Sequence, residues 1–430
     1  MTDNLPSAPG SLRPRNRNRV GDSPIRHGRL KSHHPLATAA KWLAAVVGVL
    51  AVSTASVAAF AVYDTVSNIK PGIHLATLPG AKAQAVPDIG AIEGGANLLL
   101  AGTDTRTGQV GFSSKSDLAG SSGAGNNDVT MLLHISADHT NAVVVSFPRD
   151  MIVSVPACGT RPAASGVMFN STLARGGLSC TVLTVEKMTG LDIQYGAEIS
   201  FDGVIGMSNA VGGVTVCLAT PVKDKYVGLN LPAGQQTLEG GTALAFVRSR
   251  HGVGDGSDLG RISNQQVFLS ALMRKITSGG VLSNPLTLYS LAKTAVANMQ
   301  LSDGLTRPTN LVAIALALKG IGLGNIVFLQ YPTISDPANA NRVAAQLSSA
   351  DVLNAALRAD QPVQLTGKIG RAAEADPAAP PTATTPSGTA TSTPTPSASS
   401  PATPAPTAVA LPSNVSGQTA SQQTCTKGNN

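Results

Sequence analysis

The chain has 430 residues, 42% of them hydrophobic and 13% charged, so it can bury a substantial core and is not an intrinsically disordered protein. The formal net charge of +7 is concentrated in the first 41 residues. The charged residues there are Arg13, Arg15, Arg17, Arg19, Arg26, Arg29, Lys31 and Lys41 against Asp3 and Asp22. The remainder is close to neutral, which argues against nucleic-acid binding, and residues 1–41 are predicted to be a basic cytoplasmic tail.

An uncharged stretch, WLAAVVGVLAVSTASVAAFAVY, follows this tail at residues 42–63. Its length suits a transmembrane helix across a hydrocarbon layer of about 30 Å, and Trp42 and Tyr63 stand where interfacial aromatic residues are common. The positive flank predicts a single-pass plasma-membrane protein with a cytoplasmic N-terminus and an extracytoplasmic catalytic domain. A cleaved signal peptide, with Ala59 and Ala61 near its cleavage site, is the main alternative, and a buried soluble helix is another.

The rest of the chain divides by composition. Residues 64–91 are predicted to be a linker broken by Pro and Gly, residues 92–363 a folded α/β domain, and residues 364–430 a disordered tail rich in Pro, Thr and Ala. Short apolar runs, typical of strands covered on both faces, occur at 97–102, 129–135, 142–147, 213–218 and 325–331. Helical patterns occur at 181–189, 201–210, 239–247, 259–277 and 309–319.

Four cysteines fit an oxidising compartment. Cys158 and Cys180 are a possible disulfide, whereas Cys217 lies in an apolar run and is predicted to be a core thiol. Cys425 has no assigned partner. No Cys/His spacing indicates zinc or redox chemistry.

Charged residues follow or border several of the predicted strands, where open α/β sheets commonly bind ligands. They are Asp104 and Arg106, Asp128, and Arg149 and Asp150. The stretch at residues 243–266 adds Arg248, Arg250, Asp258, Arg261 and, one helical turn after Arg261, Gln265. Each has a structural alternative: a turn or cap for the aspartates at 104 and 128, a local ion pair for Arg149 with Asp150 or Asp258 with Arg261, and solvated charge for Arg248 and Arg250.

Taken together, these residues predict a diphosphate site. Five arginines of a charge-poor domain gather in these positions, and guanidinium groups match phosphate oxygens in bidentate fashion. Carboxylates without thiolates or imidazoles suit a hard cation, Mg²⁺ or alternatively Mn²⁺. The Walker A, G-x-S-x-G and H-E-x-x-H motifs are absent.

An ordered series of motifs closely resembles the LytR-CpsA-Psr family of membrane-anchored phosphotransferases. The motifs include NLLLAGTDTR, NNDVTMLLHI, VVVSFPRDMIVSVP, FNSTLARGG, LEGGTALAFVRSRHG and DLGRISNQQ. The resemblance implies a three-layer α/β/α sandwich with a deep apolar pocket for a polyprenyl chain. Two departures stand out: a long Gly/Ser-rich segment between Asp104 and Asp128, and Asn264 where many members have Arg.

The resemblance also implies the roles of the site residues. Asp104 and Asp128 would hold the magnesium, and Arg106, Arg149, Arg248, Arg250, Arg261 and Gln265 would surround a pyrophosphate, with the two aspartates and Arg149, Arg248 and Arg250 as the catalytic set. The implied reaction moves a glycopolymer from polyprenyl pyrophosphate to peptidoglycan. Ala and Gly richness with only thirteen lysines suggests an actinobacterium and hence arabinogalactan as cargo.

Three alternative functions remain at the sequence level. A lipid-pyrophosphate phosphatase would use the same site with water as acceptor. A noncatalytic wall-anchored scaffold or lipid-binding regulator would use the arginines for recognition only. A transcription regulator is opposed by the predicted topology, which places the folded domain across the membrane from DNA.

Overall fold

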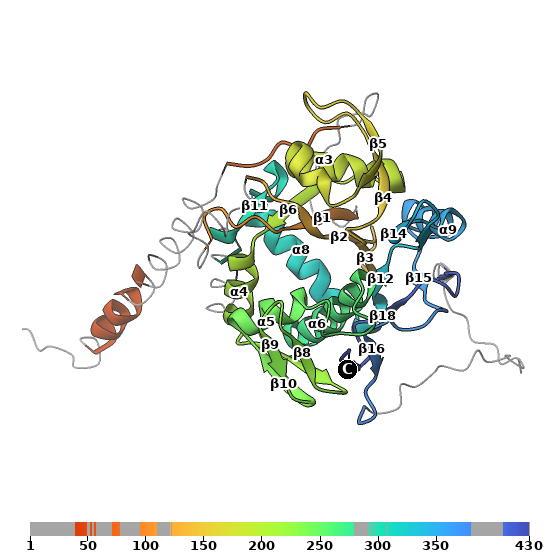
Figure 1. Cartoon of the computed structure of the whole chain (residues 1–430). Helices are drawn as coiled ribbons and strands as arrows, with labels where there is room; N and C mark the ends of the chain where they lie inside the picture. The colour runs from red at the N-terminus through yellow and green to blue at the C-terminus, as the bar shows by residue number, and fades with distance from the viewer. Residues whose placement is uncertain are drawn as a thin grey trace, which may run out of the picture. The chain divides into compact units, whose positions relative to one another are not determined.

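A seven-stranded mixed sheet forms the centre of the fold (Figure 1). The computed structural model describes residues 39–49, 52–53, 56, 71–77, 95–109, 121, 123–278, 291, 294–295, 297–306, 308–379 and 407–429. In sheet order the strands are β11 (Met299–Leu301), β6 (Tyr195–Ile199), β1 (Ala96–Thr103), β2 (Asn127–Ile135), β3 (Ala142–Phe147), β12 (Ile326–Gln330) and β18 (Gly417–Thr419). The apolar runs predicted at 97–102, 129–135, 142–147 and 325–331 are thus confirmed as strands.

Strand directions bring several chain segments to one edge of this sheet. β1 is parallel to β6 and β12 is parallel to β3, while β2 is antiparallel to both β1 and β3. The carboxyl ends of β1, β3, β6 and β12 therefore meet the amino end of β2. Asp104, Arg106, Asp128 and Arg149 follow or begin these strands, so they lie at a common edge.

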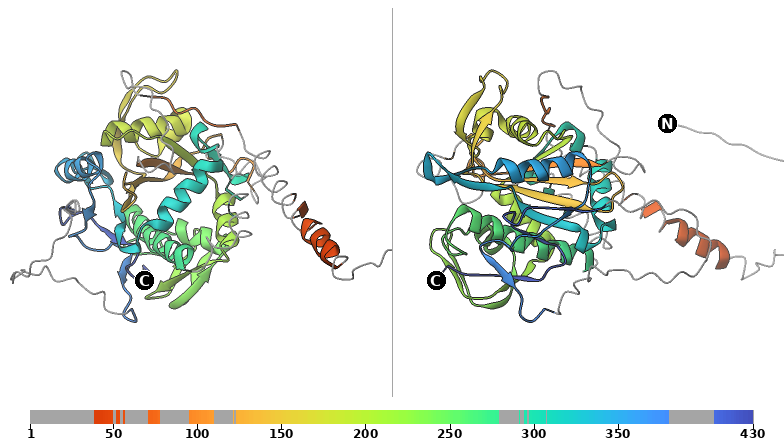
Figure 2. Two further views of the ribbon diagram at one scale, coloured as in Figure 1. Left: turned by 180° about the vertical axis from the view of Figure 1, so that it is seen from behind. Right: turned by 90° about the vertical axis from the view of Figure 1, so that its right-hand side faces the viewer.

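Helices cover both faces of the sheet, which confirms the α/β sandwich. Their bounds are α3 (Ser171–Thr189), α4 (Phe201–Ala210), α5 (Gly240–Arg248), α6 (Asp258–Ser278), α8 (Pro308–Gly320) and α9 (Leu347–Arg358). Figures 1 and 2 show α3 on one side of β1 and β2, with α6 and α8 on the other. The predicted helix at 181–189 is the second half of α3, which Gly176 and Gly177 interrupt with non-helical backbone.

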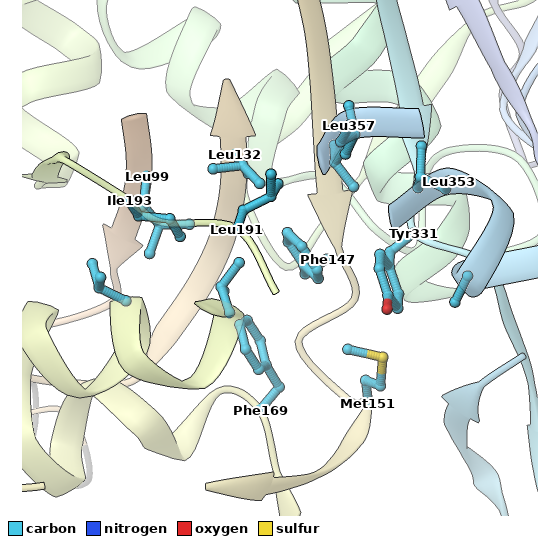
Figure 3. Close-up of a cluster of buried hydrophobic side chains, with 14 of the residues drawn as sticks. Leu99, Leu132, Phe147, Met151, Phe169, Leu191, Ile193, Tyr331, Leu353 and Leu357 are labelled. Atoms are coloured by element: carbon cyan, nitrogen blue, oxygen red, sulfur yellow. The ribbon is translucent and has the colours of Figure 1, made fainter. Parts of the chain in front are cut away.

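The two sheet faces are sealed to different degrees. Leu99 and Leu132 point toward α3 and α9 and are 0% exposed, within the cluster that Figure 3 shows. Their neighbours Leu98, Leu100 and Leu133 alternate to the opposite face, toward α6 and α8, and remain partly exposed although they belong to central strands. The packing on that second face leaves apolar surface accessible.

A second sheet holds the C-terminal segment. Its order is β10 (Gly234–Leu238), β7 (Val214–Leu218), β19 (Thr424–Thr426) and β16 (Ala373–Ala375). β19 runs parallel to β7 with Cys425 opposite Cys217, and these two cysteines form a disulfide. The predicted strand at 213–218 is therefore correct but belongs to this second sheet.

The prediction that residues 364–430 are disordered is wrong for residues 364–379 and 407–429, and residues 380–406 lie outside the described part. These short, polar strands need no core of their own, because they pair with existing strands and are cross-linked. Cys217 is accordingly not a free thiol, and Cys425 has a partner. The predicted Cys158–Cys180 disulfide is confirmed.

Small ladders and turns complete the folded part. They are β4 (Ile152–Val155) with β5 (Ala164–Met168), β8 (Val222–Asp224) with β9 (Leu229–Leu231), β13 (Thr333–Asp336) with β14 (Asn339–Ala345), β15 (Val363–Gln364) with β17 (Val409–Ala410), and the 3₁₀ turns η2 (Asp303–Thr306) and η3 (Leu323–Asn325). Part of the predicted linker also belongs to the fold, since Ile73 bonds through its amide to the carbonyl of Leu301 at 2.9 Å.

The N-terminal region is described only in part. Residues 39–49 are helical, and the predicted tail, residues 1–41, lies almost wholly outside the described residues. Among the helices that the structure describes, none combines the length and the apolar character needed to cross a membrane. The predicted span at 42–63, much of which lies outside the described positions, is not confirmed.

Removing the Cys217–Cys425 disulfide should destabilise the fold more than removing Cys158–Cys180. The first joins residues 208 apart in sequence and the second residues 22 apart. The chain-entropy model gives losses of about 5 and about 3 kcal/mol in the free energy of unfolding. Urea unfolding of the full-length chain with paired Cys→Ser substitutions measures both losses. An equal or smaller loss for Cys217 and Cys425 would contradict the larger stabilisation expected from this disulfide.

Candidate functional site

A β-bulge brings Asp128 next to the end of β1. Gly102 pairs with Val129 and Thr103 with Asn127, so Asp128 is the extra residue of β2 with no partner across the ladder. Such a bulge bends the strand and redirects a side chain. The long segment between Asp104 and Asp128 therefore does not separate them: the hairpin returns β2 to the point where β1 ends.

Asp104 is fixed by the returning strand. Its carboxylate accepts hydrogen bonds from the backbone amide of Asn126 at 2.6 Å and from the Asn126 side chain at 3.3 Å. Its own amide donates to the carbonyl of Asn126 at 3.0 Å. Gly125 is required here, because its φ is +69° and a Cβ would lie 2.7 Å from the Asp104 carboxylate.

Arg149 links three acidic residues. Its Nη1 lies 2.5 Å from Asp128 Oδ1, and its Nε lies 3.6 Å from Asp150 and 4.0 Å from Asp258. Burial alone would lower the pKa of Arg149, but the ion pair with Asp128 and the nearby carboxylates reverse this effect and raise the pKa above its ordinary value. Arg149 is thus held as a cation although its side chain is only 24% exposed.

Asp258, the first residue of α6, joins this helix to β3. It accepts a hydrogen bond from the backbone amide of Arg149 at 3.2 Å and pairs with Arg261 at 2.6 Å. Arg261 also donates to the backbone carbonyl of Asp128 at 2.8 Å. The local Asp258–Arg261 ion pair considered from the sequence is therefore present. Together with the bonds to Arg149 and Asp128, it fixes α6 relative to β2 and β3.

Two further arginines lie near the carboxylate of Asp150. Arg250 Nη2 lies 3.9 Å and Arg342 Nη1 lies 3.6 Å from its carboxylate. Arg342 belongs to β14, and sequence reasoning missed it because no motif connects that hairpin with the strand ends. The local Arg149–Asp150 pair is also present, within this larger network.

Arg248, the last residue of α5, stacks on an aromatic ring. Its guanidinium carbon lies 4.2 Å from the ring centroid of Phe201. Burial lowers the pKa of Arg248, and the nearby cations of Arg106 and Arg261 act in the same direction, whereas Asp128 and Asp104 oppose them. The arginines at 106, 248 and 261 are therefore close enough to interact, as expected for one site.

Three of these guanidinium groups have a buried Nε atom that makes no hydrogen bond with the residues the structure describes. They belong to Arg149, Arg250 and Arg261, and Arg149 Nε lies 3.6 Å from the Asp150 carboxylate. The guanidinium groups of Arg149 and Arg250 are partly exposed, so their outer N–H groups can bind the oxygens of an anion. A phosphate-type ligand fits this cluster.

The side chains of α6 at positions 264 and 265 both bond to the last turn of α5. Gln265 donates to the carbonyl of Val247 at 2.9 Å, which supports the last turn of α5. Asn264 is 0% exposed; it donates to the carbonyl of Phe246 at 2.7 Å and accepts from Thr426 at 2.8 Å. The departure at 264 therefore connects α6 to the C-terminal strand, and contact of Gln265 with a pyrophosphate stays a prediction.

Asp224 is a functional candidate that sequence reasoning missed. Its carboxylate accepts the Ser249 hydroxyl at 2.9 Å and the backbone amides of Arg250 and Gly252 at 3.1 Å each. These bonds fix the turn that carries Arg250. Burial would raise the pKa of Asp224, but the hydrogen bonds outweigh it and lower the pKa below 3.8.

The carboxylate oxygens of Asp104 and Asp128 are the type of ligand that a hard cation prefers. Mg²⁺ is usually held by one or two carboxylates together with phosphate oxygens. Among the described residues, one group of three side chains is close enough together to bind a metal ion, namely Cys217, Asp376 and Cys425. Its two cysteines form a disulfide, so their sulfurs are not thiolate ligands. The protein would therefore supply two ligands at the arginine cluster, and the substrate the others.

Comparison with known proteins agrees with this arrangement of strands and charges. The model described as "LytR_cpsA_psr family" matches residues 65–358. The chain belongs to the LytR-CpsA-Psr family. The match includes all the site residues from Asp104 to Arg342.

Similar proteins are cell-wall proteins of this family. The chain is 36% identical to the probable cell wall biosynthesis protein LcpB of Corynebacterium glutamicum over 53% of its own length and 52% of the relative's. It thus spans about half of that relative. It is 28% identical to the polyisoprenyl-teichoic acid–peptidoglycan teichoic acid transferase TagT of Bacillus subtilis, over 65% of this chain and 84% of TagT.

A solved structure supports the fold. A crystal structure of a Streptococcus agalactiae protein matches 63% of this chain and 89% of its own, with a TM-score of 0.51 and 20% identity. The LytR-CpsA-Psr membership predicted from the motifs is confirmed.

Inorganic pyrophosphate should bind to the arginine cluster. Arg250→Ala removes a partly exposed guanidinium, so we expect about a tenfold or greater loss of affinity by calorimetry. Arg161→Ala, at an exposed turn, is the charge-matched control and should bind as the wild type does. Equal affinities for all three proteins would contradict an anion site at these arginines.

Asp224→Asn should weaken both the fold and pyrophosphate binding, because it removes the charge that orders the Arg250 turn. We expect a loss of about 2 kcal/mol in the free energy of unfolding near neutral pH. Since the folded-state pKa is lowered, this contribution exists above about pH 4 and disappears as the pH falls through the lowered pKa. Chemical unfolding from pH 2 to 7 tests this, with Asp192→Asn at an exposed position as control; a pH-independent difference would refute it.

Proposed function

We propose that this protein is a phosphotransferase that moves a glycopolymer from a polyprenyl-pyrophosphate donor to a hydroxyl of peptidoglycan. The observation that carries the proposal is the arginine cluster, with partly exposed guanidinium groups on Arg149 and Arg250, beside two carboxylates at the strand ends. The name of TagT, a transferase of polyisoprenyl-linked teichoic acid, supports the same class of reaction.

The less sealed sheet face supports a lipid-linked donor. Leu98, Leu100 and Leu133 expose apolar surface toward α6, the helix that also carries Asp258 and Arg261. A polyprenyl chain against this face would bring its pyrophosphate to the arginines. This arrangement agrees with an extracytoplasmic domain attached to the plasma membrane by residues 42–63, which forms part of the proposal.

The reaction we propose is a single displacement at phosphorus. The acceptor oxygen forms a bond to the phosphorus next to the sugar, the bond from this phosphorus to the bridging oxygen breaks, and polyprenyl phosphate leaves with that oxygen. Arg149, Arg248 and Arg250 stabilise the negative charge that spreads over the phosphate oxygens. The carboxylate of Asp104 or Asp128 accepts the hydroxyl proton.

Asp104 and Asp128 would hold Mg²⁺, with Mn²⁺ as an alternative, and the bound ion would supply further charge neutralisation at the phosphates. Arabinogalactan is the polymer we propose as cargo. The actinobacterial composition and the similarity to a corynebacterial cell-wall protein support this choice.

The test uses the full-length protein in detergent with Mg²⁺ and a short-chain polyprenyl-pyrophosphate glycan, with and without peptidoglycan. We expect a phosphodiester conjugate only when acceptor is present, and a fall of at least about a hundredfold in its rate for Arg149→Ala and for Asp128→Ala. Arg161→Ala should react as the wild type does. Free glycan phosphate without conjugate would indicate a phosphatase, and lipid binding without turnover would indicate a scaffold.

A further inference from the structure

Two adjoining cavities lie beside the Asp104 loop, in a region that the arginine cluster does not occupy. Their volumes are about 200 and 440 Å³, and Thr105, Thr107, Glu198 and Gln300 line both. We call this pair of cavities the Glu198 cavity. It lies at the same sheet edge, because Glu198 belongs to the carboxyl end of β6, next to β1.

The lining of the Glu198 cavity has the opposite chemistry to that of the arginine cluster. It consists largely of hydroxyl, amide and carboxylate side chains, and the described residues that line the two cavities include no lysine or arginine. Such a site disfavours phosphates, which need cations, and suits neutral groups that both donate and accept hydrogen bonds. Sugar hydroxyl groups have this property.

The wall of the cavity is ordered by hydrogen bonds. Thr105 donates through its hydroxyl to the carbonyl of Gly123 at 2.8 Å. Gln109 donates to the carbonyl of Thr105 and accepts from the amide of Asp202 at 3.1 Å. Gln300 is exposed, and its side chain forms no hydrogen bond with the residues that the structure describes, so the side-chain amide is available to a ligand.

The same wall also holds Asp104. Thr105 directly follows Asp104 in the chain, and the cavity-lining residues Gly123 and Ala124 precede Asn126, which binds the Asp104 carboxylate. A hydroxyl group bound in the cavity beside Thr105 would therefore lie next to the loop that positions the Asp104 carboxylate.

We propose that the Glu198 cavity binds the acceptor, a hydroxyl-bearing glycan strand of peptidoglycan, and directs one hydroxyl toward Asp104. Glu198 and Gln300 bind the sugar hydroxyls, and Thr107 contributes a further hydroxyl contact. This assignment rests on the proposed transferase function, whose donor occupies the arginine cluster.

The first experiment measures binding without catalysis. The full-length protein in detergent is titrated with a soluble peptidoglycan tetrasaccharide of N-acetylglucosamine and N-acetylmuramic acid. We expect Glu198→Gln and Gln300→Ala each to weaken binding about tenfold. Glu374→Gln, at an exposed position of β16, should bind normally, and all variants should keep wild-type affinity for inorganic pyrophosphate. No wild-type binding, or unchanged binding by both variants, overturns the assignment.

The second experiment separates this proposal from the transferase proposal. In the transfer assay, Glu198→Gln and Gln300→Ala should raise the KM for peptidoglycan about tenfold without a change in the KM for the lipid donor. Transfer with an unchanged acceptor KM would refute the acceptor site and leave the transferase intact. Tetrasaccharide binding that depends on Glu198, in a protein without transfer, would refute the transferase and leave the glycan site. Thermal unfolding midpoints establish that each variant is folded.

Discussion

The site depends on an electrostatic constraint: several guanidinium groups must stay close together although they repel one another. The carboxylates of Asp128, Asp150 and Asp258 satisfy this constraint. Asp128 lies at the start of β2, Asp150 lies in the turn after β3, and Asp258 begins α6. The arginine cluster therefore also fixes where β2 begins, β3 ends and α6 begins. The charges that would bind a phosphate help to hold the fold together, which explains why a chain with few charged residues concentrates them here.

The central sheet places three chemically different surfaces at or next to one edge. Arginines occupy the region around β3 and α6, neutral and acidic polar groups line the cavity next to β6, and partly exposed apolar side chains lie on the face toward α6 and α8. Each surface suits a different part of a lipid-linked glycan reaction. Asp104 and its loop lie between the first two, so their position decides how these surfaces cooperate.

The sequence was informative where local pattern and topology agree. Apolar runs predicted the strands, and the rule that sheet sites lie beyond strand ends selected Asp104, Asp128 and Arg149. It failed where structure arises from distant pairing. The strands at Gly417–Thr419 and Thr424–Thr426 are too short and polar to be recognised alone, and they form against β12 and β7. Arg342 and Asp224 were missed because hairpins remote in sequence bring them to the site.

The Cys217–Cys425 disulfide has a consequence for cleavage of the chain. The segments before residue 380 and after residue 406 are both incorporated into sheets, and Cys425 is bonded to Cys217. A single cut of the backbone between these two segments would therefore release no fragment. It would produce a nicked molecule of two polypeptides that stay covalently joined under oxidising conditions and separate only after both reduction and unfolding.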